Sequence, residues 1–519
     1  MKDFNFLKFM VTGLAVLMTG PAFAEDVLRI SIPADIRSTN PGVSRDGTTD
    51  IVMAHVVEPL VAPRDNLEIG PALAKSWTVS PDGRTYTFTL RDGATFHNGE
   101  PVTSREVVWS WERMLKPETK FLCRNWFDGT GPTGIKIEKI EAVDTRTVAF
   151  KLAQPQPMFL ARMGHIPCVS AILHPSSVGP DGNWKEPVGT GPFRITEWKK
   201  DQYLELRRYE GYKPLPGQAD GLAGGREPLV DKLRFTIIPD PAAAKMALLA
   251  GDLDVATALD LDAIPELKAS SSVKVESSAT AGMEVLLLRN TDPLLKSREM
   301  RQAIAYALDR APIAELATGG LGEPNPSFVA PQTAFWGEEF KKAPPQNFDK
   351  VRELLAAAGY KGEPITIVTN MQQQADNKSA IMIQAMLQQA GINAQLEIME
   401  FATQIQAQSK GTYQAMVMAF SARPDVTMAL DVFVGDSKQR TNAVTDDPAI
   451  QAMVSESGQI ADPQKRRALL TKIHAALLED ATTIVLFNRV EADGLAANVE
   501  GYKRWAMALP RFWGVRLKK

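Results

Sequence analysis

The stretch YTFTLRDGATFHNGEPVTSREVVWSWERM, residues 86–114, carries the clearest secondary-structure signals of the chain. Its first residues alternate between large apolar side chains, such as Tyr86 and Phe88, and threonines, which is typical of a strand with one buried face. Asp-Gly and Asn-Gly pairs then mark turns. Thr103 and Glu106 have capping-box spacing, and the apolar residues after them repeat on one face of a helix. We therefore predict a strand, a turn segment and an amphipathic helix that serve as scaffold.

Catalytic motifs are not visible in the sequence. The five histidines form no H-E-x-x-H pair, and no G-x-S-x-G, P-loop or G-x-G-x-x-G motif occurs. We therefore expect a protein that is not an enzyme and that uses no cofactor and no metal ion.

Length and charge narrow the class further. A chain of 519 residues is too long for one hydrophobic core and predicts about two to four domains. The formal net charge of −3 gives no basic face, so we expect no nucleic-acid partner.

The first 24 residues resemble a targeting segment. Lys2 and Lys8 precede an apolar run, residues 9–19, and Ala22-Phe23-Ala24 forms an A-x-A cleavage site. The run is shorter than the roughly 20 residues that a membrane span needs. We predict a secretory signal peptide over 1–24, and no lipid anchor, because no cysteine stands at the cleavage point.

The chain has two cysteines, Cys123 and Cys168. In an oxidising compartment the two thiols can form a disulfide. Two separate buried thiols are the alternative, because the sequence does not report how far apart the Cα atoms lie.

The second half of the chain alternates between helical and strand patterns. From residue 347 onward, amphipathic helices end at glycines and lead into short apolar strands such as ITIVTN, residues 365–370. This alternation is typical of α/β folds.

One of these strands ends in charged residues. The apolar run from Met416 to Phe420 leads directly into Ser-Ala-Arg-Pro-Asp, residues 421–425. Strand ends in open α/β sheets commonly line ligand crevices, which makes Arg423 and Asp425 candidate ligand contacts. An internal Arg423–Asp425 salt bridge is the alternative.

Several segments together resemble one family, the extracytoplasmic solute-binding proteins of ABC importers, family 5, which includes peptide-, opine- and nickel-binding members. Besides residues 86–114, the segments that carry the resemblance are VGTGPFRITEW (188–198), AAAKMALLAGDLDVA (242–256), MRQAIAYALDR (300–310) and FSARPD (420–425). They occur in the family's order and cover essentially the whole chain after residue 24.

The resemblance implies an α/β, two-lobed Venus-flytrap fold of class II, or cluster C, with an extra inserted domain. Domain I would comprise 25–56, 187–278 and 490–519, domain II 57–186, and domain III 279–489. It also implies a periplasmic, monomeric protein that closes about a hinge on its solute and then docks on an inner-membrane permease.

The family's binding residues can be carried over to a few positions. Asp425 matches an aspartate that holds the α-amino group of a peptide, and Phe420 stands where the family commonly has Trp. Arg423, two residues after Ser421, matches an arginine that can hold a carboxylate or phosphate in bidentate fashion.

Three further positions complete the predicted site. Gln373 replaces the arginine that dipeptide binders use for the peptide carboxylate. Asn40 stands where relatives often have an acidic residue before the proline, and Thr39 and Asn40 either face the cleft or simply form the turn. The predicted solute is a short peptide or a polar solute of similar size, with an opine or sugar-phosphate conjugate as the alternative. A metal chelate, a secreted hydrolase and a periplasmic chaperone are less favoured.

Overall fold

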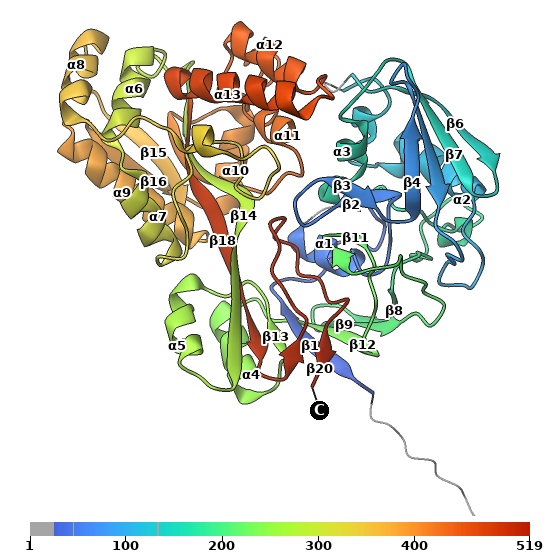
Figure 1. Ribbon diagram of the computed structural model, residues 1–519. Helices are drawn as coiled ribbons and strands as arrows, with labels where there is room; N and C mark the ends of the chain where they lie inside the picture. The colour runs from blue at the N-terminus through green and yellow to red at the C-terminus, as the bar shows by residue number, and fades with distance from the viewer. Residues whose placement is uncertain (1–24, 45, 132–133, 519) are drawn as a thin grey trace, which may run out of the picture.

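The computed structural model describes residues 25–44, 46–131 and 134–518, so the predicted signal peptide lies outside the described residues. Figure 1 shows two lobes, one above the other, that are joined by two long strands, and a smaller domain beside them. The predicted α/β, two-lobed fold is confirmed.

One ten-stranded sheet runs through both lobes. In spatial order its strands are β16 (Ala394–Met399), β15 (Ile365–Asn370), β17 (Ala415–Phe420), β14 (Val273–Leu288), β18 (Thr483–Ala496), β13 (Val255–Ala256), β1 (Val27–Ile32), β12 (Lys232–Ile237), β9 (Tyr203–Arg208) and β8 (Phe193–Lys199). We call the part with β1, β8, β9, β12 and β13 lobe 1, and the part with β15, β16 and β17 lobe 2.

The strands β14 and β18 belong to both lobes. They pair with each other in antiparallel fashion along most of their length. The end of β14 from Met283 onward also pairs with β17 of lobe 2, whereas β18 pairs with β13 of lobe 1 only at Gly494 and Leu495. The lobes are therefore linked through this strand pair, which forms the hinge.

Lobe 2 is a sheet covered by helices on both faces. Successive residues of β14 point to opposite faces, so that Leu286 and Leu288 belong to one core and Val285 and Leu287 to the other. The helices of this lobe are α6 (Arg298–Ala307), α7 (Arg310–Thr318), α8 (Phe348–Ala358), α9 (Gln374–Gln389), α10 (Phe401–Lys410), α11 (Val426–Leu430), α12 (Pro448–Ser457) and α13 (Pro463–Asp480).

The small domain, as we name it, contains the stretch 86–114. Its four-stranded sheet has the order β4 (Ala74–Val79), β5 (Thr85–Leu90), β7 (Thr147–Leu152), β6 (Ile137–Asp144), and it also carries the hairpin of β2 (Val61–Pro63) and β3 (Ile69–Pro71) and the helices α2 (Ser104–Leu115) and α3 (Phe159–Met163). Thr103 and Glu106 form both bonds of the predicted capping box at the start of α2. Trp111 of α2 is fully buried in the core of this domain, as expected for scaffold.

Cys123 and Cys168 form a disulfide in the small domain, with their Cα atoms 5.7 Å apart. Of the two alternatives left by the sequence, the disulfide is the one that the structure contains.

Lobe 1 builds its core from both ends of the chain. Leu28 of β1 and Phe235 of β12 share one apolar cluster with Trp505 and Phe512 near the C-terminus. Its helices and short strands are α1 (Gly47–Met53), α4 (Pro241–Ala250), α5 (Ile264–Lys268), β10 (Ala219–Asp220), β11 (Ala223–Gly224), β19 (Val499–Glu500) and β20 (Arg516–Leu517). The domain boundaries given above remain predictions.

Candidate functional site: the cleft between the lobes

The cleft between lobe 2 and the small domain contains three cavities. Their volumes are about 440, 700 and 470 Å³, and each is lined by residues of both parts. The largest offers the volume typical of a small-molecule site, which is roughly 300–1,000 Å³.

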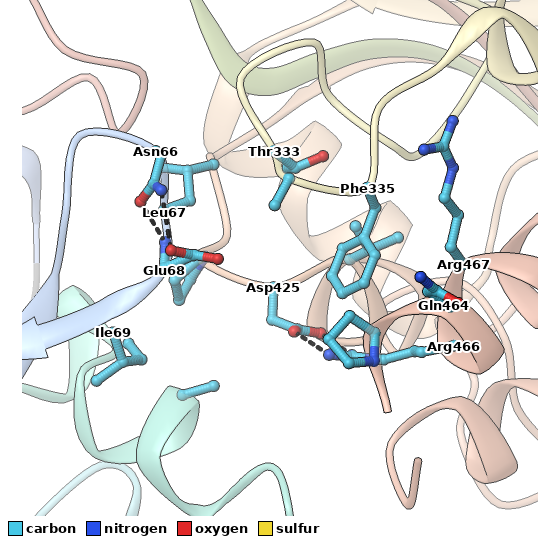
Figure 2. A pocket seen from close by; sticks show the side chains of 15 residues that line it. Asn66, Leu67, Glu68, Ile69, Thr333, Phe335, Asp425, Gln464, Arg466 and Arg467 are labelled. Carbon is cyan, nitrogen blue, oxygen red and sulfur yellow. Dashed lines mark hydrogen bonds and ion pairs between the residues drawn. The ribbon is translucent and has the colours of Figure 1, made fainter. Parts of the chain in front are cut away.

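The 440 Å³ cavity brings the β2–β3 hairpin opposite lobe 2. Figure 2 shows Asn66 and Glu68 of the hairpin on one side, with Phe335, Asp425 and Arg466 on the other. The hairpin loop, the N-cap of α11 at Asp425 and the first turn of α13 at Arg466 thus supply the polar groups.

Asp425 is held by Arg466 in a buried, bidentate ion pair. The guanidinium Nη1 and Nη2 atoms lie 2.8 and 2.6 Å from the two carboxylate oxygens. Asp425 also caps α11 by accepting from the backbone N–H of Thr427, and Arg466 donates to the Thr427 hydroxyl. The ring of Phe335 lies under the guanidinium, 5.1 Å away. These contacts fix the arginine and carboxylate together at the wall of the cleft.

Two interactions cross the cleft. Arg162 of α3 donates to Asp431 at the end of α11 over 2.9 Å, and Arg466 lies 3.4 Å from the sulfur of Met158. Burial raises the pKa of Asp431, and the guanidinium of Arg162 acts in the opposite direction. The small domain and lobe 2 are therefore in contact, as expected for a closed arrangement.

The 700 Å³ cavity combines an aromatic wall with many amides. Trp126 lies between the stacked ring of His165, at 5.3 Å, and the guanidinium of Arg162, at 5.0 Å. The amides that line the same cavity are Gln156, Gln439, Asn442, Gln451 and Gln459. Neutral donors and acceptors beside an aromatic face suit a polar solute with an apolar part.

Of the seven predicted site residues, Arg423 and Asp425 line these cavities. Arg423 lies at the 700 Å³ cavity and donates to the backbone carbonyls of Ser421 and Ala422. The carboxylate of Asp425 pairs with Arg466, a partner that the sequence did not predict.

The other five residues make internal contacts or lie at the surface. Thr39 accepts from the indole N–H of Trp184, and Asn40 accepts from Arg113. Phe420 packs edge-on against Phe433, with ring centres 4.5 Å apart, and Ser421 is exposed.

Gln373 contacts the hinge. Its backbone N–H donates to Asn370, and its side-chain carbonyl accepts from Arg489 of β18 over 3.3 Å. None of the cavities described above includes it.

The sequence analysis missed Arg466 and Arg162. Both are buried charges, but each partner lies far away in the chain, 41 and 269 residues respectively. The one available signal was the Asp-Pro start of α13, which places Arg466 in the first turn of that helix.

Within residues 25–44, 46–131 and 134–518, no group of three or more His, Cys, Asp or Glu side chains is arranged to hold a metal ion. In the same part of the chain, no helix combines the length and apolarity that crossing a membrane requires.

The fold and the cleft define a two-lobed binding protein. The chain belongs to the bacterial extracellular solute-binding proteins, family 5, whose middle-region model matches residues 68–441.

Three relatives illustrate the similarity. A putative ABC transporter peptide-binding protein of Brucella ovis is 32% identical over 372 residues, which cover 68% of this chain and 64% of that protein. The periplasmic binding protein DppA of Helicobacter pylori, solved in complex with the peptide STSA, has a TM-score of 0.78 at 25% identity and covers 95% of this chain and 99% of its own. AgaA of A. tumefaciens R10, solved with agropinic acid, shares the fold with a TM-score of 0.75 at 24% identity, over 95% and 99% of the two chains.

Proposed function

We propose that this chain is the periplasmic solute-binding protein of an ABC importer, and that it captures a short peptide or a polar solute of similar size. Lobe 2 closes onto lobe 1 and the small domain, and the closed protein docks on the permease. We further propose that it is exported by the signal peptide over 1–24, carries no lipid anchor, acts as a monomer and catalyses no reaction.

The observation that carries this proposal is the 700 Å³ cavity between two parts of the molecule that Arg162 and Asp431 connect. Closure removes the solute from water, so each charge on it needs a fixed partner. Arg423 is the residue that we assign to an anionic group of the solute, and its guanidinium matches a carboxylate or phosphate in bidentate geometry. The Asp425–Arg466 pair forms the adjoining wall.

A second candidate solute is an opine-type conjugate of a sugar and an amino acid. The five amides of the cavity are compatible with it, because amides donate to and accept from hydroxyl groups as well as peptide groups. AgaA, the structural relative with agropinic acid, has the same fold.

Native mass spectrometry of protein purified without denaturation tests both candidates by identifying the co-purified solute. A peptide mass would support the first candidate and a sugar conjugate the second. A protein that carries no solute, and binds none from a mixture of short peptides and opine-type conjugates, would refute the proposed function.

The role of Arg423 has a matched control in the same segment. Arg423→Ala is expected to weaken binding of an anionic solute at least tenfold, because a charge-assisted contact contributes about 1.5–3 kcal/mol. Lys438→Ala removes an exposed cation nearby and should leave the affinity unchanged. Equal effects of the two substitutions would refute a specific contact at Arg423.

A further inference from the structure

The hinge has a well-defined crossing point. Ala279 of β14 pairs with Val490 of β18, and Met283 pairs with Asn488, so three residues of β14, 280–282, lie opposite Arg489 alone. A Cβ atom on Gly282 would lie 2.9 Å from the carbonyl oxygen of Phe420, which leaves no room for a side chain. Arg489 therefore sits where any rotation between the lobes takes place.

A buried carboxyl pair lies immediately next to this crossing point. Glu284 of β14 is in register with Ala419 of β17 and Phe487 of β18, in the middle of the sheet, and is 0% exposed. Asp376, in the first turn of α9, is also 0% exposed and contacts the carboxyl group of Glu284.

The pair has few donors around it. Among the residues that the structure describes, no N–H or O–H group donates to either oxygen of Glu284, and its carboxyl partner Asp376 is itself an acceptor. Asp376 accepts from the side chain of Asn370 over 3.1 Å through Oδ2, and no donor to its buried Oδ1 is found among the described residues. A hydrogen bond between Glu284 and Asp376 therefore requires a proton on one of them.

The charges around Glu284 and Asp376 balance only if one of the two carboxyl groups carries a proton. The groups that face the pair are Arg489 from β18 and Asn370 from β15, and Gln404 from α10 accepts from the same Asn370 amide; Arg489 alone of these is charged. One guanidinium offsets one carboxylate, and a second buried carboxylate without a donor costs several kcal/mol. Burial, and after it the charge of Asp376, raises the pKa of Glu284 well above its usual value, while Arg489 opposes the shift.

The helix that carries Asp376 also touches lobe 1. Gln374 donates to Asp260 over 2.9 Å, and the ammonium group of Lys378 lies 2.8 Å from Asp262. Asp260 caps the short helix η5 (Leu261–Ala263) of lobe 1. The first turn of α9 thus holds the carboxyl pair on one side and the contact with lobe 1 on the other.

We propose that Glu284 and Asp376 form a proton-binding site in the hinge, and that its proton stabilises the closed arrangement of the lobes. Losing the proton leaves two carboxylates in contact, and their repulsion displaces the first turn of α9 from lobe 1. Opening admits water to this turn and relieves the repulsion. This inference rests on the proposed function in one respect: closure of the lobes is the step that captures the solute.

The direction of the pH dependence follows from linkage. The closed form excludes water from the pair and binds the proton more tightly than the open form, so the pKa is higher when the lobes are closed. Between the two pKa values, a rise in pH therefore lowers the closed-to-open ratio by up to about tenfold per pH unit. Solute capture is accordingly accompanied by proton uptake.

Infrared spectroscopy of the solute-free protein tests the proton directly. Wild type near neutral pH should show the carbonyl band of a protonated carboxyl group, and both Glu284→Gln and Asp376→Asn should lack it. In each variant the amide N–H donates to the remaining carboxylate, so the same hydrogen bond forms without a bound proton. Glu276→Gln, on the lobe 1 half of the same strand, is the matched control and should retain the band.

Small-angle X-ray scattering over a pH series tests the coupling. Wild type should expand as the pH rises, and Glu284→Gln should stay compact across the series. An absent carboxyl band, or the same expansion in Glu284→Gln and wild type, would overturn the proposal. Calcium-dependent compaction that both amide variants abolish would also overturn it, because the pair would then hold a cation. None of these measurements needs a solute, so a failed solute search would refute the proposed function and leave this inference standing.

Discussion

The Asp425–Arg466 ion pair permits a quantitative test of what the two residues do. Asp425→Ala removes the carboxylate and leaves a guanidinium whose side chain is 11% exposed without its partner. Breaking a buried pair in this way costs about 3–5 kcal/mol, and the loss of a helix cap about 1 kcal/mol more. Arg466 keeps its contacts with the Thr427 hydroxyl and the Phe335 ring, so the lower end applies to the ion pair and we expect a total of about 4 kcal/mol.

The assay is urea unfolding of the single variants Asp425→Ala and Arg466→Met and of the double variant. The double variant should be more stable than Asp425→Ala by about 2 kcal/mol, because no buried charge remains without a partner. Additive effects of the two single substitutions would refute the reasoning. A loss of solute binding in Asp425→Ala with a stability cost below about 1 kcal/mol would instead show that the carboxylate is reserved for the solute.

Removing the disulfide by the double substitution Cys123→Ser and Cys168→Ser should lower the free energy of unfolding by about 4 kcal/mol for a 45-residue separation; an unchanged urea midpoint would contradict this. Arg162→Ala should open the cleft, because Asp431 loses its partner across it, and an unchanged radius of gyration in small-angle scattering would argue against a role in closure. Burial lowers the pKa of His55 to about 3, so the neutral ring stabilises the fold above the unfolded-state pKa of 6.5, and this stability is lost as the pH falls toward 3. His55→Gln should therefore flatten the acid limb of the stability–pH curve by up to about 1.4 kcal/mol per pH unit, and parallel curves would disprove it.

Local patterns predicted the local structure well. The capping box at Thr103, the strand at 85–90 and the helix–strand alternation after 347 depend on neighbours in sequence, and all are present. The strand that ends at Phe420 likewise brought Arg423 to the cleft wall, because a strand end in such a sheet meets the crevice.

Partners of buried charges could not be predicted in the same way. Asp425 was assigned either to a ligand or to the nearby Arg423, but the fold brings Arg466 to it from another helix. Thr39 and Asn40 are polar residues after a strand, and only the packing of Trp184 and Arg113 shows that their oxygens already have donors. A resemblance transfers positions along the chain, whereas the partner of each polar atom depends on side chains that differ between relatives.

The clustering of both chain ends in lobe 1 determines the order in which the molecule can fold. Lobe 2 is built from one continuous segment between β14 and β18, so it can form before synthesis is complete. Lobe 1 needs Trp505 and Phe512 to complete the core around Leu28, and these residues are made after all of lobe 2. Such long sequence separations slow folding, so the part that contains the first strand is the last to become native. The core of lobe 1 therefore stays incomplete in a nascent chain until Trp505 and Phe512 have been made.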